Sequence, residues 1–206
     1  MNTKKLLPVA ATAIAAAIAL AGCSGTPGSS GTSGTSMPGM DHGMMGSSSP
    51  ATAPATDHNA ADVIFAQMMI PHHEQAIEMS EMILKKQGIS AEVAALANRI
   101  KAAQGPEIEK MKGWLKDWNQ SMQMPSGHGM DGMMGADDIA KLEAAQGKEA
   151  AKLFLTQMIT HHEGAITMAK TESAGGKNSD AIQLSKDIIS AQEAEIKEMR
   201  QLLTTI

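Results

Sequence analysis

Apolar residues recur at helical spacing along four long stretches of the chain. The first stripe has intervals of four, three, four, three and four, and consists of Phe65, Met69, His72, Ala76, Met79 and Ile83. Such spacing is typical of a helix that packs one face against partners. Comparable patterns, together with a turn signal at Gln87, Gly88 and Ser90, predict helices at about 58–87, 90–121, 138–174 and 179–204.

The four stretches are two copies of one unit. Phe65–Met79 aligns with Phe154–Met168 at a constant offset of 89, and each copy contains the sequence His-His-Glu. Further along, Glu107 recurs as Glu195 at an offset of 88, so one residue was lost between them. Two helical hairpins are too few for an open solenoid but can close into a bundle. We therefore expect an all-α protein with one four-helix bundle over residues 57–206.

The N-terminal residues 1–22 have the features of an export signal. Two lysines precede an apolar stretch, which ends in Leu-Ala-Gly-Cys at residues 20–23. This ending resembles the lipobox of bacterial lipoproteins, in which the cysteine becomes the lipidated first residue of the mature chain. We expect a lipid on Cys23 and a protein anchored to the cell membrane on its extracytoplasmic side. The alternative is an ordinary secretory signal with an incidental cysteine.

Residues 23–56 are predicted to form a flexible tether. From 24 to 56, Ser (8), Gly (7), Thr (5) and Pro (4) supply 24 of 33 residues, a composition that cannot form a hydrophobic core.

The composition limits the chemistry of the chain. Its 206 residues exclude a large multidomain enzyme. Seventeen basic residues against 22 acidic ones, a formal charge of -5, argue against nucleic acid as a partner. A single Cys permits neither an internal disulfide nor a cysteine-based zinc or iron–sulfur site. A metal would have to be held by the 7 His, the 18 Met or carboxylates.

Methionine and histidine gather in two glycine-rich tracts outside the helices. One lies in the tether and the other in the predicted central loop at 122–136. The candidate ligands of these tracts are Met37, Met40, His42, Met44 and Met45, and Met124, His128, Met130, Met133 and Met134. Thioethers are soft ligands that select Cu(I) over zinc, magnesium or calcium, and imidazole suits copper in either oxidation state.

A second group of candidates lies on the apolar stripes of the helices. His72 and His161 occupy the first and third helices, and Glu107 and Glu195 the second and fourth. A carboxylate on such a stripe is costly unless it is paired or bound to metal. The neighbouring candidates are Met69, Met79, Met111, Met158, Met168 and Met199, with His73 and His162 as alternates because adjacent residues of a helix point about 100° apart. The alternative is that Met fills the core and His72 pairs with Glu107.

The paired motifs Met-Ile-x-His-His-Glu-x-Ala-Ile-x-Met and Ala-Gln-x-x-Glu-Ile-x-x-Met resemble those of the bacterial family called domain of unknown function 305. The resemblance covers about residues 60–204 and implies a ferritin-like four-helix topology. It also implies export, and some members are associated with copper binding and copper tolerance. The chain departs from the family pattern at Glu74 and Gln75, where Gln and Gly are common, and at Thr160, which replaces Pro.

Three function classes follow from these features. We favour a copper-binding lipoprotein that buffers, sequesters or hands on Cu(I), with Cu(II) as the alternative state, and so contributes to copper tolerance. Handing on implies a copper-transfer partner protein. A redox enzyme of the di-iron type is disfavoured, because no His has a Glu three residues before it, and we expect a binding protein rather than an enzyme. The third class is a metal-free helical scaffold or protein-interaction lipoprotein.

Overall fold

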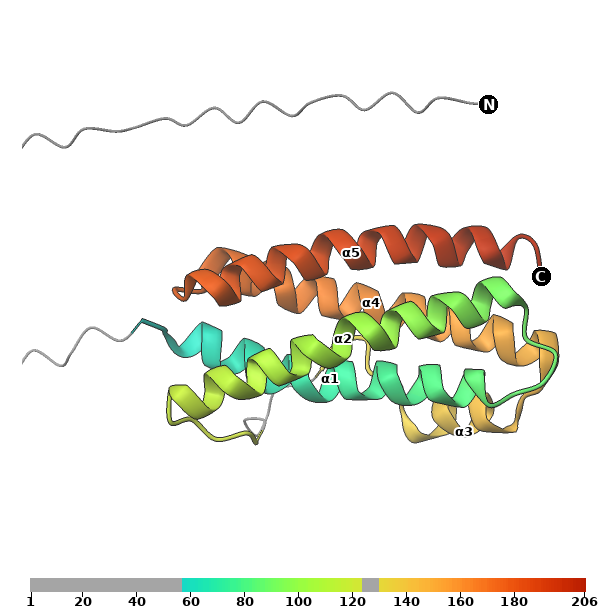
Figure 1. The fold of residues 1–206 in the computed structure, drawn as a ribbon, viewed down its shortest axis with the longest axis horizontal. Coiled ribbons are helices and arrows are strands. Elements are labelled where there is room, and N and C mark those ends of the chain that lie inside the picture. Colours follow the sequence, from blue (N-terminus) through green and yellow to red (C-terminus); the bar gives the residue numbers. More distant parts are fainter. Residues whose placement is uncertain (1–56, 124–129) are drawn as a thin grey trace, which may run out of the picture. The chain divides into compact units, whose positions relative to one another are not determined.

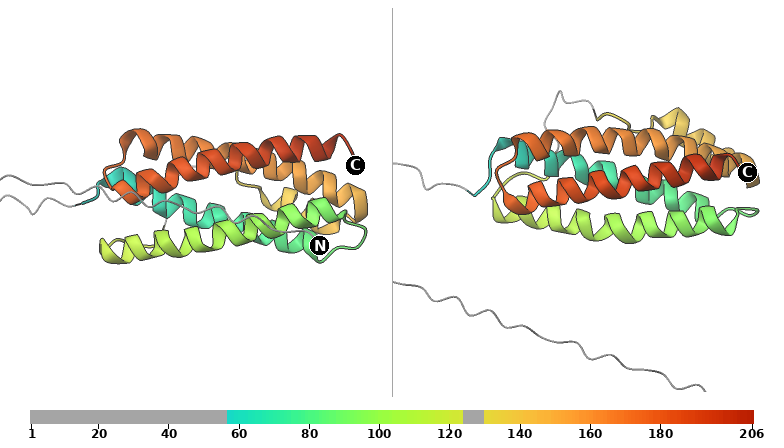
Figure 2. Two further views of the ribbon diagram at one scale, coloured as in Figure 1. Left: turned by 45° about the horizontal axis from the view of Figure 1, so that its top comes forward. Right: turned by 90° about the horizontal axis from the view of Figure 1, so that it is seen from above.

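The computed structural model describes residues 57–123 and 130–206, and the regular structure in these two ranges is entirely helical. Four long helices lie side by side, and a short one flanks them (Figures 1 and 2). The helices are α1 (Ala60–Leu84), α2 (Ala91–Asp117), α3 (Ala136–Ala144), α4 (Gly147–Gly175) and α5 (Ser179–Leu203). α1 pairs with α2, α4 pairs with α5, and α1 also packs against α4. The predicted all-α four-helix bundle of two hairpins is confirmed.

The prediction of one continuous third helix over 138–174 was wrong, because this stretch forms two helices, α3 and α4. Ala145 and Gln146 adopt extended backbone conformations, and Gly147 follows with a φ of 54° that favours glycine. Lys86 stabilises the break, since its Nζ donates to the carbonyl oxygens of Glu143 and Ala145, both at 2.8 Å. Carbonyl groups at a helix end need such partners.

Side-chain caps set where the helices begin. Ser90 caps α2 by accepting from the N–H of Val93, and Asn178 caps α5 in the equivalent place. The two capping residues lie 88 positions apart in the sequence, which agrees with the offset of the duplicated unit. The duplication therefore extends to the residues that start the second helix of each hairpin.

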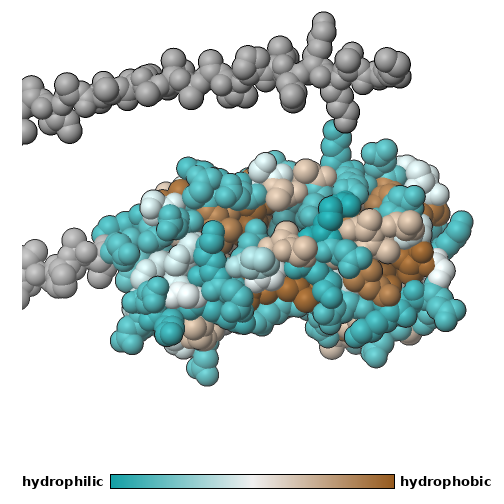
Figure 3. Space-filling model, viewed as in Figure 1, coloured by the Kyte–Doolittle hydropathy of each residue, from teal (hydrophilic) through white to brown (hydrophobic). Residues whose placement is uncertain are grey.

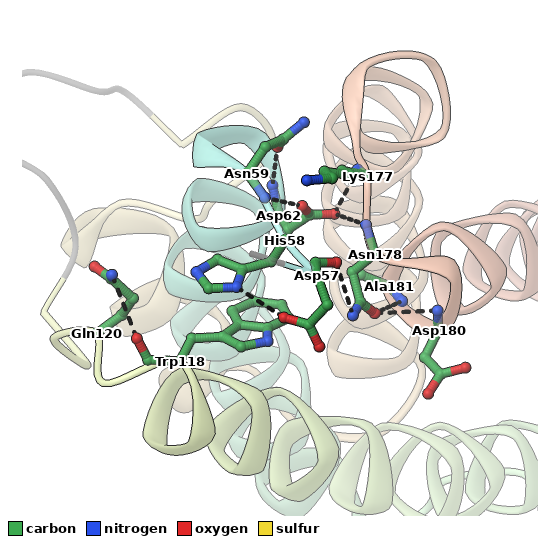
Figure 4. Close-up of polar contacts among 10 residues, drawn as sticks. All are labelled: Asp57, His58, Asn59, Asp62, Trp118, Gln120, Lys177, Asn178, Asp180 and Ala181. Carbon is green, nitrogen blue, oxygen red and sulfur yellow. Dashed lines mark hydrogen bonds and ion pairs between the residues drawn. The ribbon is translucent and has the colours of Figure 1, made fainter. Parts of the chain in front are cut away.

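A polar network joins the start of α1 to the turn between α4 and α5 (Figure 4). Asn59 and Asp62 form a capping box at the first turn of α1. Asp62 Oδ1 also accepts from the backbone N–H groups of Lys177 and Asn178, each at 2.9 Å. One buried carboxylate thus ties the two hairpins together at this end of the bundle.

The described chain begins at the same end with a stack of rings. The imidazole of His58 lies on the indole of Trp118, with centroids 4.6 Å apart and planes inclined by 12° (Figure 4). Trp118 in turn stacks near Trp114, at 5.9 Å between centroids. Aromatic contacts of this kind fasten the residues before α1 to the end of α2.

The hydrophobic core is divided into two clusters, each built from all four long helices. The first core cluster includes Ala76, Met79, Ile83, Leu96, Ile100, Phe154, Met158, Ile196 and Met199. The second core cluster includes Phe65, Met69, Ile108, Met111, Leu115, Ala165, Ala169, Leu184 and Ile188. On each of the four long helices, the residues between the two clusters include buried polar side chains.

Hydrophilic residues cover most of the face drawn in Figure 3, and hydrophobic ones appear in several patches between them. Met122, at 49 % exposure, is the exposed large hydrophobic residue of the described ranges. None of the described helices has the length and apolar character needed to span a membrane.

Candidate metal centre

Four histidines lie at mid-height in the bundle, between the two core clusters. His72 and His73 come from α1, His161 and His162 come from α4, and all four are fully buried. Helices α2 and α5 add a Gln and a Glu each at the same level. We call this set the histidine layer; its other members are Gln104, Glu107, Gln192 and Glu195.

Each hairpin contains one histidine–glutamate pair. His73 Nε2 donates to Glu107 Oε2 at 2.8 Å, and His162 Nε2 donates to Glu195 Oε2 at 2.7 Å. The glutamates are 22 % and 18 % exposed, so they connect the buried rings to the surface. The alternative that pairs His72 with Glu107 was wrong, because it is the ring of His73 that faces α2 and bonds to Glu107. The 100° between adjacent helical positions turns the ring of His72 towards α4 instead.

The two inner histidines meet at the contact between α1 and α4. The rings of His72 and His161 have centroids 3.7 Å apart and planes inclined by 40°. The pKa of His72 is lowered to about 3, first by burial and then by the nearby His73, while the bond to the Asp131 carbonyl acts in the opposite direction. Burial, followed by the proximity of His72, also holds the pKa of His161 well below its usual range. Both rings are therefore neutral at pH 7, the form that binds metal.

The hydrogen bonds of the layer fix which ring nitrogen carries the proton. His72 Nε2 donates to the carbonyl oxygen of Asp131 at 3.1 Å, just as His73 and His162 donate to carboxylates. A carbonyl or carboxylate oxygen accepts, so each of these rings carries its proton on Nε2. Their Nδ1 atoms are buried without a hydrogen-bond partner, as are both ring nitrogens of His161. The layer thus holds several imidazole lone pairs with no protein donor.

Residues 130–134 of the methionine-rich loop lie directly on the histidine layer, and we call them the docked segment. Gln75 holds this segment with two hydrogen bonds: its Nε2 donates to the Met134 carbonyl at 2.9 Å, and its Oε1 accepts from the Met134 N–H at 2.8 Å. Met130 and Met133, like Met134, are half-buried. The structure thus brings the three described methionines of the second predicted tract to the predicted histidines.

The methionines predicted on the helices lie in the hydrophobic clusters that flank the layer. The fully buried ones are Met79, Met158 and Met199 in the first core cluster and Met69 and Met111 in the second. Met168 packs half-buried against the second cluster. These positions fit the core-filling alternative, and they also place thioethers on both sides of the histidines. Within residues 57–123 and 130–206, no group of three or more His, Cys, Asp or Glu is arranged to hold a metal ion.

A comparison with protein families tests the family resemblance that the motifs suggested. The sequence profile of the family described as domain of unknown function (DUF305) matches residues 62–203. The chain belongs to the DUF305 family. No protein of curated function matches it.

Solved structures of DUF305 proteins share the fold. A protein from Streptomyces coelicolor, assigned as secreted, is 32 % identical, with a TM-score of 0.67 over 70 % of this chain and 91 % of that one. A fragment from Deinococcus radiodurans is 27 % identical, with a TM-score of 0.66 over 72 % and 98 % of the two chains. CopM in its Cu(I)-bound form is 34 % identical, with a TM-score of 0.61 over 70 % and 96 %. CopM has also been solved with Cu(II) and with silver bound.

Several predicted residues of this DUF305 chain lie outside the described residues. They are Cys23, Met37, Met40, His42, Met44, Met45, Met124 and His128. Conversely, the motif analysis missed the contacts of Gln75, Asp131 and Gly164 with the docked segment and the layer. One signal was available for two of them: Gln75 departs from the family pattern, and it occupies the place that Gly164 has in the second repeat, 89 residues later.

Proposed function

We propose that this DUF305 protein binds copper outside the cytoplasm, where it buffers, sequesters or hands on the ion and so contributes to copper tolerance. Its histidine layer is the principal binding centre in this proposal. Binding, and no catalytic step, is the activity that we assign. Copper is the cargo of the protein.

The observation that carries the proposal is the protonation pattern of the layer. Three rings donate Nε2–H to an oxygen acceptor and keep a buried Nδ1 lone pair without a partner. Metal-ligating histidines almost always have this arrangement, in which a carboxylate or carbonyl orients the ring through its other nitrogen. Glu107 and Glu195 have this orienting role in our proposal, and the unpartnered ring nitrogens of the four histidines are available to the ion.

Soft donors near the layer favour Cu(I), while the imidazoles also suit Cu(II). Met69 and Met158 precede His72 and His161 by three residues, and the docked segment adds Met130, Met133 and Met134. CopM, 34 to 36 % identical to this chain, has been solved with Cu(I) and with Cu(II) bound, which supports both oxidation states as candidates. We assign the tether tract and Met124 and His128 as additional ligands that collect the ion.

The extracytoplasmic location rests on the export signal of residues 1–22, and the secreted assignment of the Streptomyces coelicolor relative supports it. We further propose that a lipid on Cys23 anchors the chain to the membrane, with the tether at 23–56 between anchor and bundle. Transfer of copper to a partner protein is part of this proposal, and nucleic acid is not.

One observation favours the second candidate, a metal-free scaffold or protein-interaction lipoprotein. In the described part of the chain, no three His, Cys, Asp or Glu side chains are grouped as metal ligands. The His72 and His161 rings lie in contact, so an ion bound by both requires them to turn. If the layer is only a polar core network, copper has no effect on it.

An anaerobic titration of the mature chain with Cu(I), in competition with a chromophoric chelator, tests the proposal. We expect the wild type to take copper from the chelator and to unfold at a higher temperature when loaded, since binding to the native state stabilises it. The double variant His72→Ala and His161→Ala should lose that thermal shift. His58→Ala is the matched control, because this ring lies on Trp118 away from the layer. A wild type that never competes, or a double variant with an undiminished shift, contradicts the assignment.

A further inference from the structure

The docked segment is held to the bundle from two sides, and both contacts involve its backbone. On the α1 side, the Gln75 side chain forms two hydrogen bonds with the backbone of Met134, and the His72 ring donates to the Asp131 carbonyl. Side chains of α1 therefore recognise the path of the segment, whatever its own side chains are.

On the α4 side, backbone meets backbone. A Cβ atom on Gly164 would overlap the carbonyl oxygen of Asp131, the atom that accepts from His72. Gly132 has a φ of 81°, and a Cβ atom there would come within 2.7 Å of the Thr160 carbonyl oxygen and 2.9 Å of the Gly164 Cα. Only glycine at both places permits this approach. Gly164 thus sets how near the Asp131 carbonyl comes to the histidines.

The two contacts come from the same position of the duplicated unit. Gln75 and Gly164 are 89 residues apart, which is the repeat offset, and each follows a His-His-Glu sequence. A bundle of two identical hairpins offers two equivalent faces, but the chain has only one loop between the hairpins to cover them. Gln in one repeat and Gly in the other allow this single loop to bind both hairpins at once.

We propose that Gln75 and Gly164 are positioning residues of the copper centre, an inference that rests on the proposed function. They seat the docked segment so that the Asp131 carbonyl holds the His72 proton on Nε2. The lone pair of Nδ1 is then always available to copper. Without this seating, His72 loses its acceptor and its ring distributes the proton over both nitrogens.

Two variants of the mature chain test the inference. Gly164→Ala pushes the segment away by steric overlap, and Gln75→Leu removes its side-chain hydrogen bonds without adding bulk to α4. Gly113→Ala is the matched control, because it is also a Gly-to-Ala change within a long helix, and a Cβ there meets nothing within 4 Å. The readouts are the ¹⁵N chemical shifts of the His72 ring in the copper-free protein and the Kd for Cu(I).

We expect the control to match the wild type, with the proton of His72 on Nε2. In both docking variants, the ring shifts should move towards a mixture of tautomers, and the Kd for Cu(I) should rise about tenfold or more, as losses of ligand-orienting partners do. A merely structural role of the two residues would leave the tautomer of His72 unchanged. If Gly164→Ala does not fold, Gln75→Leu gives both readouts alone.

The outcomes separate this inference from the function on which it rests. A wild type and a control that bind Cu(I), with docking variants that bind it equally well or keep the Nε2–H tautomer, overturn the positioning role and leave copper binding intact. A wild type that binds no Cu(I) refutes the proposed function and this inference together.

Discussion

The carboxyl group of Glu172 is buried beside that of Asp62, and burial together with this neighbour favours the protonated form of Glu172. Glu172 is 1 % exposed, and its oxygens have no donor group within reach among the described residues. Its pKa is raised to about 8, first by burial and then by its contact with Asp62. Burial also acts to raise the pKa of Asp62, but hydrogen bonds from Glu172 and from the backbone of Asn59, Asn178 and Lys177 outweigh it and lower the value.

This pair predicts a loss of stability in alkaline solution. A carboxyl group with an ordinary pKa of 4.5 and a folded-state pKa of about 8 stabilises the fold fully below pH 4.5. Its contribution falls as the pH rises from 4.5 through 8, because the unfolded chain releases the proton more readily. Glu172→Gln carries no ionisable proton and should be more stable than the wild type at pH 9, by about 1 to 3 kcal/mol.

Urea unfolding of both proteins at pH 5 and at pH 9 measures this difference. Glu193→Gln is the control, since Glu193 is 57 % exposed and its loss should leave the pH dependence unchanged. Parallel stability curves for the wild type and Glu172→Gln would show that Glu172 has no shifted pKa.

The histidine–glutamate pairs predict a stability effect that does not depend on copper. Glu107→Ala leaves the buried Nε2–H of His73 without its acceptor, which should lower the free energy of unfolding by about 1 to 3 kcal/mol. Arg99→Ala, which removes an exposed ion pair with Glu198, should cost less than about 1 kcal/mol. Denaturant unfolding of the copper-free variants compares them. Equal effects of the two substitutions would mean that the buried bond contributes no more than a surface ion pair.

The same Glu107→Ala variant separates the two function classes. If Glu107 orients a copper ligand, its removal should also weaken Cu(I) binding about 10- to 100-fold. Glu195→Ala should have a similar effect, because the second repeat forms the same bond. Loss of stability with an unchanged Kd for Cu(I) would favour the scaffold alternative.

The methionine tracts predict a change of copper capacity without a change of fold. Leu keeps the hydrophobic volume of Met but lacks sulfur, so the bundle should tolerate the exchange. The variant replaces Met by Leu at Met37, Met40, Met44, Met45, Met130, Met133 and Met134. We expect fewer Cu(I) ions per chain, measured by metal analysis after gel filtration, with the helical circular dichroism unchanged. Retention of full stoichiometry would exclude the tracts as ligands.

Membrane anchoring is tested by Cys23→Ser, which removes the acceptor of the lipid. We expect the variant to leave the membrane fraction on cell fractionation, because the chain offers no second acyl site in its lipobox. A variant that stays with the membrane as fully as the wild type would disprove the lipid anchor.

The sequence predicted the long helices and the inward position of the polar layer. Periodicity located every long helix, because one apolar stripe must face the core, and the repeat offset paired α1 with α4. It also predicted that His72, His161, Glu107 and Glu195 would lie on inward faces. The break at Gly147 was missed, since a single glycine in a helical pattern is compatible with a continuous helix and the decisive contact comes from Lys86, far away in the sequence.

The choice of partners within the layer depended on helix rotation, which periodicity does not resolve. The side chain of His73 points about 100° away from the stripe that includes His72. It faces α2 because α2 lies close beside α1. The docking of residues 130–134 was even harder to predict from the sequence. It depends on backbone groups and on the absence of a Cβ at Gly164, and neither feature can be recognised in the pattern of apolar residues.

The division of the core by the histidine layer has a consequence for folding that requires no ion. Sliding α4 by one turn along α1 would carry His161 and His162 in among hydrophobic side chains and bring an apolar residue opposite His72. If α4 also moved past α5, His162 would lose Glu195 and a buried imidazole would be left without its acceptor. Apolar clusters alone would tolerate the slide. The four rings therefore select a single axial alignment of the helices.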